Sequence, residues 1–186
     1  MALTGNKPKT TIDDYMPAKE GIPFQLINNS AVGLPLPTVS HQVILTRIIT
    51  ILLNFLNSID DKGLLIAGPV DVKFDDQNIL HPDIFYIGEN EKSMLLNESV
   101  KCVPDFIIEI ISTESAYYDM RQKKDIYERH GVKEYIIIDT IGLKAELYNI
   151  TDGAYILNQE VNETEKLNST FFRKLSLDMS KIFTAV

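Results

Sequence analysis

Phe106-Ile107-Ile108-Glu109-Ile110-Ile111 is the stretch of sequence that decides the fold. Apart from Glu109 the run is apolar and rich in β-branched isoleucine, which is typical of a central strand buried on both faces. An unpaired carboxylate in such a strand would cost several kcal/mol or shift its pKa. Glu109 therefore predicts a metal ion, a cation or a hydrogen-bond donor beside it. A purely structural pair with a core Lys or Arg is the alternative.

The segments on either side of this strand predict an α/β (α+β) sandwich with a mixed β-sheet. A helix capped by Ser112 or Thr113 is expected to run to about His130, where Gly131 ends it. The longest helix is expected from about Pro37 to Ser58. Strands are expected at 24–27, from 31, and at 64–67, 70–74, 79–87, 134–139, 144–150 and 154–158. Helices and strands do not alternate strictly, so a purely parallel fold is excluded.

The chain length and composition predict one domain. Residues 1–10 form a loose tail, residues 11–186 form the domain, and Leu175, Leu177, Ile182 and Phe183 are expected to pack on its core. The N-terminus has no apolar signal sequence, and Thr and Arg interrupt the apolar pattern of residues 43–56, so we expect no membrane partner. One cysteine, Cys102, excludes an internal disulfide and a cysteine zinc cluster. These features predict a cytoplasmic protein.

The charge distribution leaves two interpretations of the second helix open. The net charge of −8 argues against a general polyanion binder. Five basic residues nevertheless fall between Arg121 and Lys133. They form either a local basic surface or an ordinary solvated helix face, because acidic residues are interleaved with them.

Asp83 is the second candidate for chemistry. Taken alone, an Asp that follows Pro82 is more often a turn residue than a ligand. Together with Glu109 on a neighbouring strand, however, it forms a pair of hard oxygen donors suited to Mg²⁺, with Mn²⁺ as a substitute. Such an ion polarises a phosphoryl oxygen and lowers the pKa of a bound water.

Lys123 is the third candidate. Ala116, Met120, Lys123 and Tyr127 follow the spacing of one helical stripe, and a lysine within a core-facing stripe is unusual. The side chain is expected to lie beside Glu109, where it acts on a water or stabilises charge in the transition state. The alternative is that it extends along the helix to reach solvent.

The chain resembles the Uma-type family of restriction-endonuclease-like proteins, within the PD-(D/E)xK nuclease superfamily. The resemblance covers nearly the whole chain and rests on an ordered set of segments. These are Phe24-Gln-Leu-Ile-Asn-Asn, Pro37-Thr-Val-Ser-His-Gln, His81-Pro-Asp, Pro104-Asp-Phe-Ile-Ile-Glu-Ile-Ile-Ser, Asp119-Met-Arg-Gln-Lys-Lys-Asp-Ile-Tyr and Gly131-Val-Lys-Glu-Tyr-Ile-Ile-Ile-Asp.

The resemblance implies a restriction-endonuclease-like core in which Asp83 and Glu109 hold the metal. Lys123 on the helix supplies the lysine, because the position two residues after Glu109 is Ile111. Two departures concern further carboxylates, since Gln25 stands where the family often has Glu, and Ser30 stands where a second Glu is common. Gln25 can still offer a carbonyl oxygen.

Three further histidines and one acid complete the set of candidate residues. His41 matches a family histidine, and either a catalytic role or a capping or core role is consistent with its position. His81 and His130 are interpreted as structural or surface residues. Asp119, one turn before Lys123, is expected to keep the lysine charged and oriented.

The leading hypothesis is a metal-dependent endonuclease that hydrolyses DNA and acts as a homodimer. Asp83, Glu109 and Lys123 are its catalytic residues, supported by Gln25, His41 and Asp119. The main alternative is a non-catalytic nuclease-fold module for nucleic-acid binding or protein assembly, which the net charge and Gln25 favour. A hydrolase that uses the same metal site on another substrate is a third class, because a fold does not fix a function.

Overall fold

The computed structural model describes residues 24–33, 36–94, 99–111 and 116–184. The side chains of residues 93, 94, 99 and 116–119 lie outside this description. The expected tail of residues 1–10, the first part of the expected domain (residues 11–23) and the expected cap at Ser112 or Thr113 also lie outside it.

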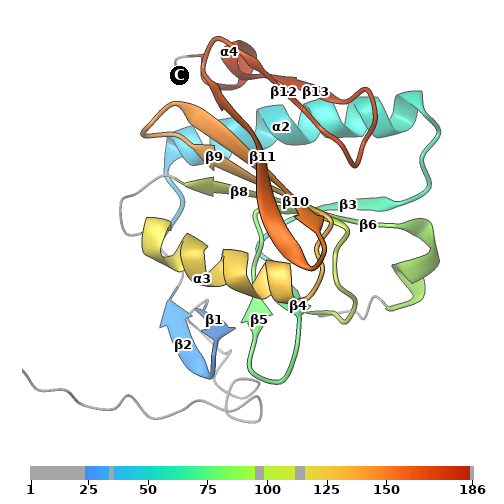
Figure 1. The fold of residues 1–186 in the computed structure, drawn as a ribbon, viewed down its shortest axis with the longest axis vertical. Coiled ribbons are helices and arrows are strands. Elements are labelled where there is room, and N and C mark those ends of the chain that lie inside the picture. The colour runs from blue at the N-terminus through green and yellow to red at the C-terminus, as the bar shows by residue number, and fades with distance from the viewer. Residues whose placement is uncertain (1–23, 34–35, 95–98, 112–115, 185–186) are drawn as a thin grey trace, which may run out of the picture.

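A six-stranded mixed sheet forms the centre of the molecule (Figure 1), with strand order β11-β10-β9-β8-β6-β3. The apolar run that contains Glu109 is strand β8, Phe106–Ile111, and all six of its residues are buried. It runs parallel to β9 and antiparallel to β6. The mixed sheet and the central strand are therefore confirmed. The other strands are β3 (Leu64–Ala67), β6 (Ile84–Ile87), β9 (Glu134–Asp139), β10 (Lys144–Thr151) and β11 (Ala154–Asn162).

The two long helices lie on opposite faces of this sheet, with α2 (Val39–Ser58) above it and α3 (Ala116–Arg129) below it in Figure 1. Successive residues of a strand point to opposite faces. Ile108 and Ile110 therefore share a cluster with the buried face of α2. Ile107 and Ile111 share another cluster with α3. Glu109 lies between the last two and faces α3.

A second sheet lies against α3 and its cluster, in the strand order β2-β1-β5-β4-β7. These strands are β1 (Phe24–Ile27), β2 (Ser30–Gly33), β4 (Asp71–Lys73), β5 (Ile79–Leu80) and β7 (Ser99–Val100), and a short 3-10 helix, η1 (Glu89–Met94), precedes β7. One prediction here is wrong. The expected strand 79–87 is two strands in two sheets, because the chain leaves one sheet after β5 and enters the other at β6. Pro82 lies in the break, where its missing N–H costs no ladder hydrogen bond.

The C-terminal segment covers the α2 side of the central sheet. Strands β12 (Lys166–Asn168) and β13 (Ser176–Asp178) pair, and α4 (Met179–Ile182) follows them beside α2 (Figure 1). Leu175, Leu177 and Ile182 are buried in the α2 cluster and Phe183 packs against it, as predicted.

Helix α2 is long and apolar enough to cross a membrane by length and composition alone, with a mean hydropathy of 1.5. It also has the features of a core helix. Ile44, Ile48, Leu52 and Leu56 recur at helical spacing and are buried against the sheet. Arg47 donates to the main-chain oxygens of Ile182 and Thr184 and so ties α2 to the C-terminal segment.

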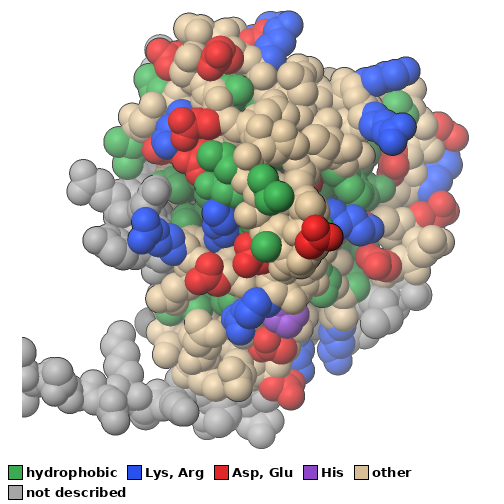
Figure 2. Space-filling view, in the orientation of Figure 1, with side chains coloured by type: hydrophobic (Ala, Val, Ile, Leu, Met, Phe, Trp, Pro, Cys, Tyr) green, Lys and Arg blue, Asp and Glu red, His purple; other side chains and the backbone are tan. Residues whose placement is uncertain are grey.

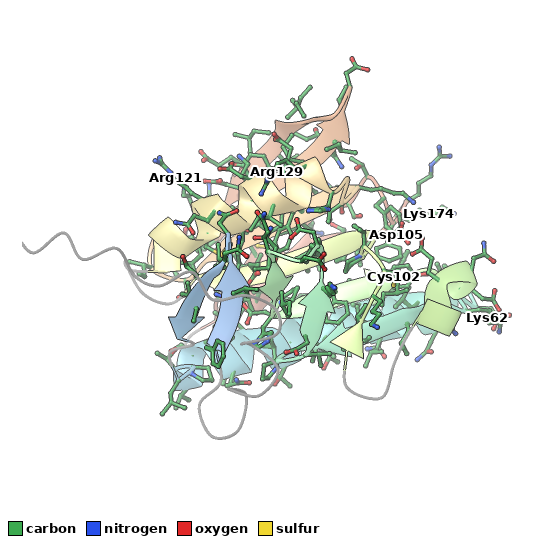
Figure 3. All side chains as sticks on the ribbon, turned by 90° about the horizontal axis from the view of Figure 1, so that it is seen from below. Lys62, Cys102, Asp105, Arg121, Arg129 and Lys174 are labelled. Carbon is green, nitrogen blue, oxygen red and sulfur yellow. The ribbon has the colours of Figure 1, made fainter. Side chains whose placement is uncertain are left out.

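The basic residues between 121 and 133 do not form one surface. Arg121 and Arg129 are exposed on α3 (Figure 3). Lys124 lies 3.5 Å from the centroid of the Tyr148 ring, and Lys133 pairs with Asp105. Lys123 is buried. On the face drawn in Figure 2, the Lys and Arg side chains are likewise interspersed with Asp and Glu.

Candidate active site

Glu109 is the buried centre of the candidate site. It is 3% exposed, and its Oε1 accepts hydrogen bonds from Lys123 Nζ at 2.8 Å and from Tyr127 Oη at 2.7 Å. Burial raises the pKa of the Glu109 carboxyl; Lys123 and Tyr127 oppose this, and the nearby charge of Asp83 adds to it. The predicted need for a partner is met by a cation and a hydroxyl donor.

Lys123 reaches Glu109 from α3 and is 6% exposed. Its Nζ also lies 3.5 Å from the main-chain oxygen of His81. Met120 and Tyr127 are buried on the same helical stripe, so the spacing correctly indicated that this stripe faces the core. The ammonium points inward to the carboxylate, and the alternative of a side chain extending to solvent is wrong.

Asp83 lies directly before β6, and β6 is the strand that pairs antiparallel with β8. Its Oδ2 accepts a hydrogen bond from Ile110 N at 2.7 Å and lies 3.2 Å from His41 Nε2. The pairing of Ile84 with Ile108 continues the antiparallel register so that Asp83 falls opposite Glu109. The two carboxylates are therefore brought to one place, although Asp83 remains 23% exposed.

The described donors approach only one oxygen of each carboxylate. Ile110 N and His41 Nε2 both meet Oδ2 of Asp83, and Lys123 and Tyr127 both meet Oε1 of Glu109. Within the described residues, Oδ1 and Oε2 receive no such bond. A carboxylate has two oxygens with about four acceptor directions, so each group keeps capacity for a ligand.

His41 and Gln25 supply two further polar groups. His41 begins α2, where its N–H donates to the N-cap Thr38, and its ring contacts Asp83. The Nδ1 atom of His41 and the Oε1 atom of Gln25 are buried without a hydrogen-bond partner among the described residues. Gln25 is 2% exposed and shares the α3-facing side of β1 with Ile27. Asp119 lies in α3, and its side chain falls outside the description.

Sequence reasoning missed two contacts around the site. The sequence pattern indicates only that Tyr127 lies on the helical stripe. In the structure its hydroxyl donates to Glu109 Oε1, the oxygen that also accepts from Lys123. His81 is buried rather than on the surface, and its Nε2 lies 2.6 Å from Asp71 Oδ1. Asp71 begins β4 and His81 directly follows β5, and the antiparallel pairing of these two strands places the two residues opposite each other. His130 contacts Asp75 at 2.9 Å, as a structural residue would.

The donor set is compatible with Mg²⁺. Across the described ranges, no cluster of three or more His, Cys, Asp or Glu side chains is arranged to hold a metal. Mg²⁺ does not require one, because it is usually bound through one or two carboxylates and completes its shell with waters and substrate phosphates. Asp83 and Glu109 would supply such carboxylates, and a divalent cation would relieve their mutual repulsion.

The mixed sheet between two helices, with two acids and a lysine at the α3 face, defines a protein of restriction-endonuclease-like architecture. The model of the family Uma2, described as "Putative restriction endonuclease", matches residues 12–180. The chain belongs to this family.

Two similar proteins bear on the fold. A crystal structure described as a "putative nuclease belonging to DUF820", from Anabaena variabilis, superposes with a TM-score of 0.78 at 16% identity. The superposition covers 94% of this chain and 97% of the Anabaena chain, which shows that the two proteins share a fold. An uncharacterized protein of Synechocystis, sll1609, is 25% identical over 99 residues. That match spans 52% of this chain and 56% of the relative.

Proposed function

We propose that this protein is a metal-dependent nuclease that hydrolyses phosphodiester bonds in DNA. The observation that carries the proposal is the meeting of Asp83 and Glu109, from adjacent strands, with Lys123 from α3. Membership of a family described as restriction endonucleases and the fold shared with a described nuclease support it.

Asp83 and Glu109 would hold the ion, with Mg²⁺ the expected metal and Mn²⁺ a substitute. When bound, the ion would polarise the phosphoryl oxygen and make a bound water more acidic. The protein's own contribution is geometric. Ile110 N–H and His41 hold one oxygen of Asp83, while Lys123 and Tyr127 hold one oxygen of Glu109. The carboxylates therefore need little reorganisation to present their other oxygens.

Lys123 would act on the phosphate and on the attacking water. Its Nζ has three protons, of which Glu109 accepts one at 2.8 Å. A second can be donated to a phosphate oxygen as negative charge develops there, a contribution typically worth about 10²–10³ in rate. The same ammonium orients the water for in-line attack, because bound geometry replaces a random encounter.

Gln25, His41 and Asp119 would support these groups. The buried Gln25 Oε1 has no hydrogen-bond partner among the described residues, so it is available to a water or to the ion. His41 restrains Asp83 through its Nε2. For Asp119 the proposal rests on its place one turn before Lys123.

A homodimer is the expected assembly. A dimer would bring two candidate centres, one from each chain, to the two strands of a duplex. Size-exclusion chromatography with light scattering would give about twice the chain mass of 21.1 kDa for a dimer.

A non-catalytic nuclease-fold module is the second candidate. The net charge of −8 favours this candidate, because phosphate binding needs cationic side chains. The charged side chains of Lys123 and Glu109 also already form an ion pair with each other. A module of this kind would bind nucleic acid or another protein without cutting DNA.

DNA cleavage with matched variants tests the proposal. Purified protein would be incubated with plasmid, linear duplex and single-stranded DNA in Mg²⁺, Mn²⁺ or EDTA. Cleavage is expected with either metal and should be lost in EDTA and in Asp83→Asn, which keeps an acceptor for Ile110 N–H. The control is Asp76→Asn, because Asp76 is 82% exposed and pairs with Lys73 on the surface. Absence of cleavage would favour the module, and equal cleavage by Asp83→Asn would show that the activity does not come from this site.

A further inference from the structure

We propose that Tyr127 is a positioning residue of the candidate metal site, and that its hydroxyl fixes the plane of the Glu109 carboxylate. This inference rests on the proposed function, because it assigns Glu109 to the metal. Tyr127 is fully buried, and its Oη donates to Glu109 Oε1 at 2.7 Å. Its place on α3, four residues after Lys123, brings both donors to the same carboxylate.

The two donors do different things to Glu109. Lys123 carries a compact charge on a flexible four-carbon stem, so it fixes where Oε1 lies but constrains the carboxylate plane weakly. Tyr127 is a rigid ring held between Phe74, at a centroid distance of 5.3 Å, and Tyr135, at 5.2 Å. A hydroxyl held by packing on both sides constrains the direction of the hydrogen bond. With Oε1 fixed by both donors, Oε2 is the oxygen that would hold a metal ion.

The donor is also neutral, which matters for a cation site. A tyrosine hydroxyl in its ordinary form is an uncharged donor, and here it donates to Glu109 Oε1. A second lysine in this place would repel an arriving divalent ion by Coulomb's law. A phenol holds the carboxylate without adding positive charge. Ligand-orienting partners of this kind are typically worth about 10- to 100-fold in metal affinity.

Tyr135 provides a matched control from the same cluster. It is also fully buried, and its ring contacts that of Tyr127. Its hydroxyl, however, points to the sulfur of Met120 at 3.8 Å instead of to Glu109. Tyr127→Phe and Tyr135→Phe each remove one buried oxygen atom and keep the ring, and only the first changes the surroundings of the carboxylate.

The test is calorimetric titration of Mn²⁺ into the full chain and the two variants, without DNA. Tyr127→Phe is expected to weaken Mn²⁺ binding, raising the dissociation constant about tenfold. Tyr135→Phe is expected to leave it unchanged. In cleavage assays, Tyr127→Phe should raise the Mn²⁺ concentration for half-maximal rate more than it lowers the rate at saturating Mn²⁺.

The outcomes separate this inference from the proposed function. Wild-type Mn²⁺ binding with no change in Tyr127→Phe, or with an equal loss in Tyr135→Phe, would overturn the role of Tyr127 alone. No Mn²⁺ binding by the wild type would overturn the metal site and this role together. A metal-free crystal structure of Tyr127→Phe provides a second measurement. Rotation of the Glu109 carboxylate is expected, and an unchanged carboxylate plane would contradict the proposal.

Discussion

Lys123 Nζ lies 2.8 Å from Glu109 Oε1 across the interface between α3 and β8, and both side chains are at least nine-tenths buried. Taking two charges out of water is costly, and their attraction often does no more than offset that cost. An apolar pair of similar size would serve stability at least as well. The stability of the core alone therefore does not account for the pair, and the proposed function uses both charges.

Removing one member of this pair should destabilise the fold strongly. Lys123→Met is expected to cost about 3–5 kcal/mol, because it leaves a buried carboxylate without its cation. Adding Glu109→Gln should recover most of that loss. Urea unfolding of the two single variants and the double variant would measure this. Equal losses that add up in the double variant would show that the two charges are not coupled.

Gly68→Ala should disturb the segment that carries Asp83. A Cβ at Gly68 would lie 2.2 Å from the main-chain oxygen of Pro82, and Gly68 N–H donates to the main-chain oxygen of Asp83 at 2.8 Å. The backbone must shift to relieve this overlap, so Asp83 should move away from Glu109. A lower midpoint of thermal unfolding and weaker Mn²⁺ binding are expected. Gly33→Ala is the control, because no atom lies within 4 Å of its added Cβ.

Glu134→Ala should release the C-terminal segment. Glu134 is fully buried, and its carboxylate accepts bonds from Ser169 Oγ, from the N–H and hydroxyl of Thr170, and from Phe171 N–H. Losing this buried acceptor should cost about 3 kcal/mol. Limited proteolysis should then cut near residues 169–171 more rapidly than in the wild type. Unchanged cutting would show that other contacts fasten this segment.

Glu146 should contribute a stability that acid removes. Burial would raise the pKa of its carboxyl, but bonds from Lys144 and Tyr148 outweigh burial and lower it. A carboxyl group whose pKa is lower in the folded state stabilises the fold fully at pH values above its unfolded pKa, near 4.5. This contribution is lost as the pH falls through the pKa of the folded state. The difference in unfolding free energy between wild type and Glu146→Gln should therefore be present at neutral pH and shrink in acid. The exposed Glu160→Gln should show little difference at either pH.

Local pattern predicted the elements that carry the site. The apolar setting of Glu109 and the core-facing stripe around Lys123 each indicate an unusual charge in a buried place, and the structure brings these residues together. The same patterns could not show where the chain changes sheets. Residues 79–87 look like one apolar strand, but their two halves pair with β4 and β8.

Contacts between distant segments were beyond the reach of sequence pattern. Tyr127 meets Glu109 because α3 crosses β8 at a particular turn. The position of Gln25 could be predicted as a strand residue. That its buried oxygen has no hydrogen-bond partner among the described residues depends on tertiary packing. Asp83 was indicated mainly by the resemblance to a family. The fold gives the physical reason for its importance, because it places this acid opposite Glu109.

A crystal structure of the protein soaked in Mn²⁺, with anomalous diffraction measured at the manganese edge, tests the central claim most directly. One anomalous peak is expected within about 2.0–2.3 Å of an oxygen of Asp83 and an oxygen of Glu109. The Glu109 oxygen should be Oε2, with Lys123 and Tyr127 still bonded to Oε1. An absent peak in crystals soaked with millimolar Mn²⁺, or a peak that contacts neither carboxylate, would contradict it.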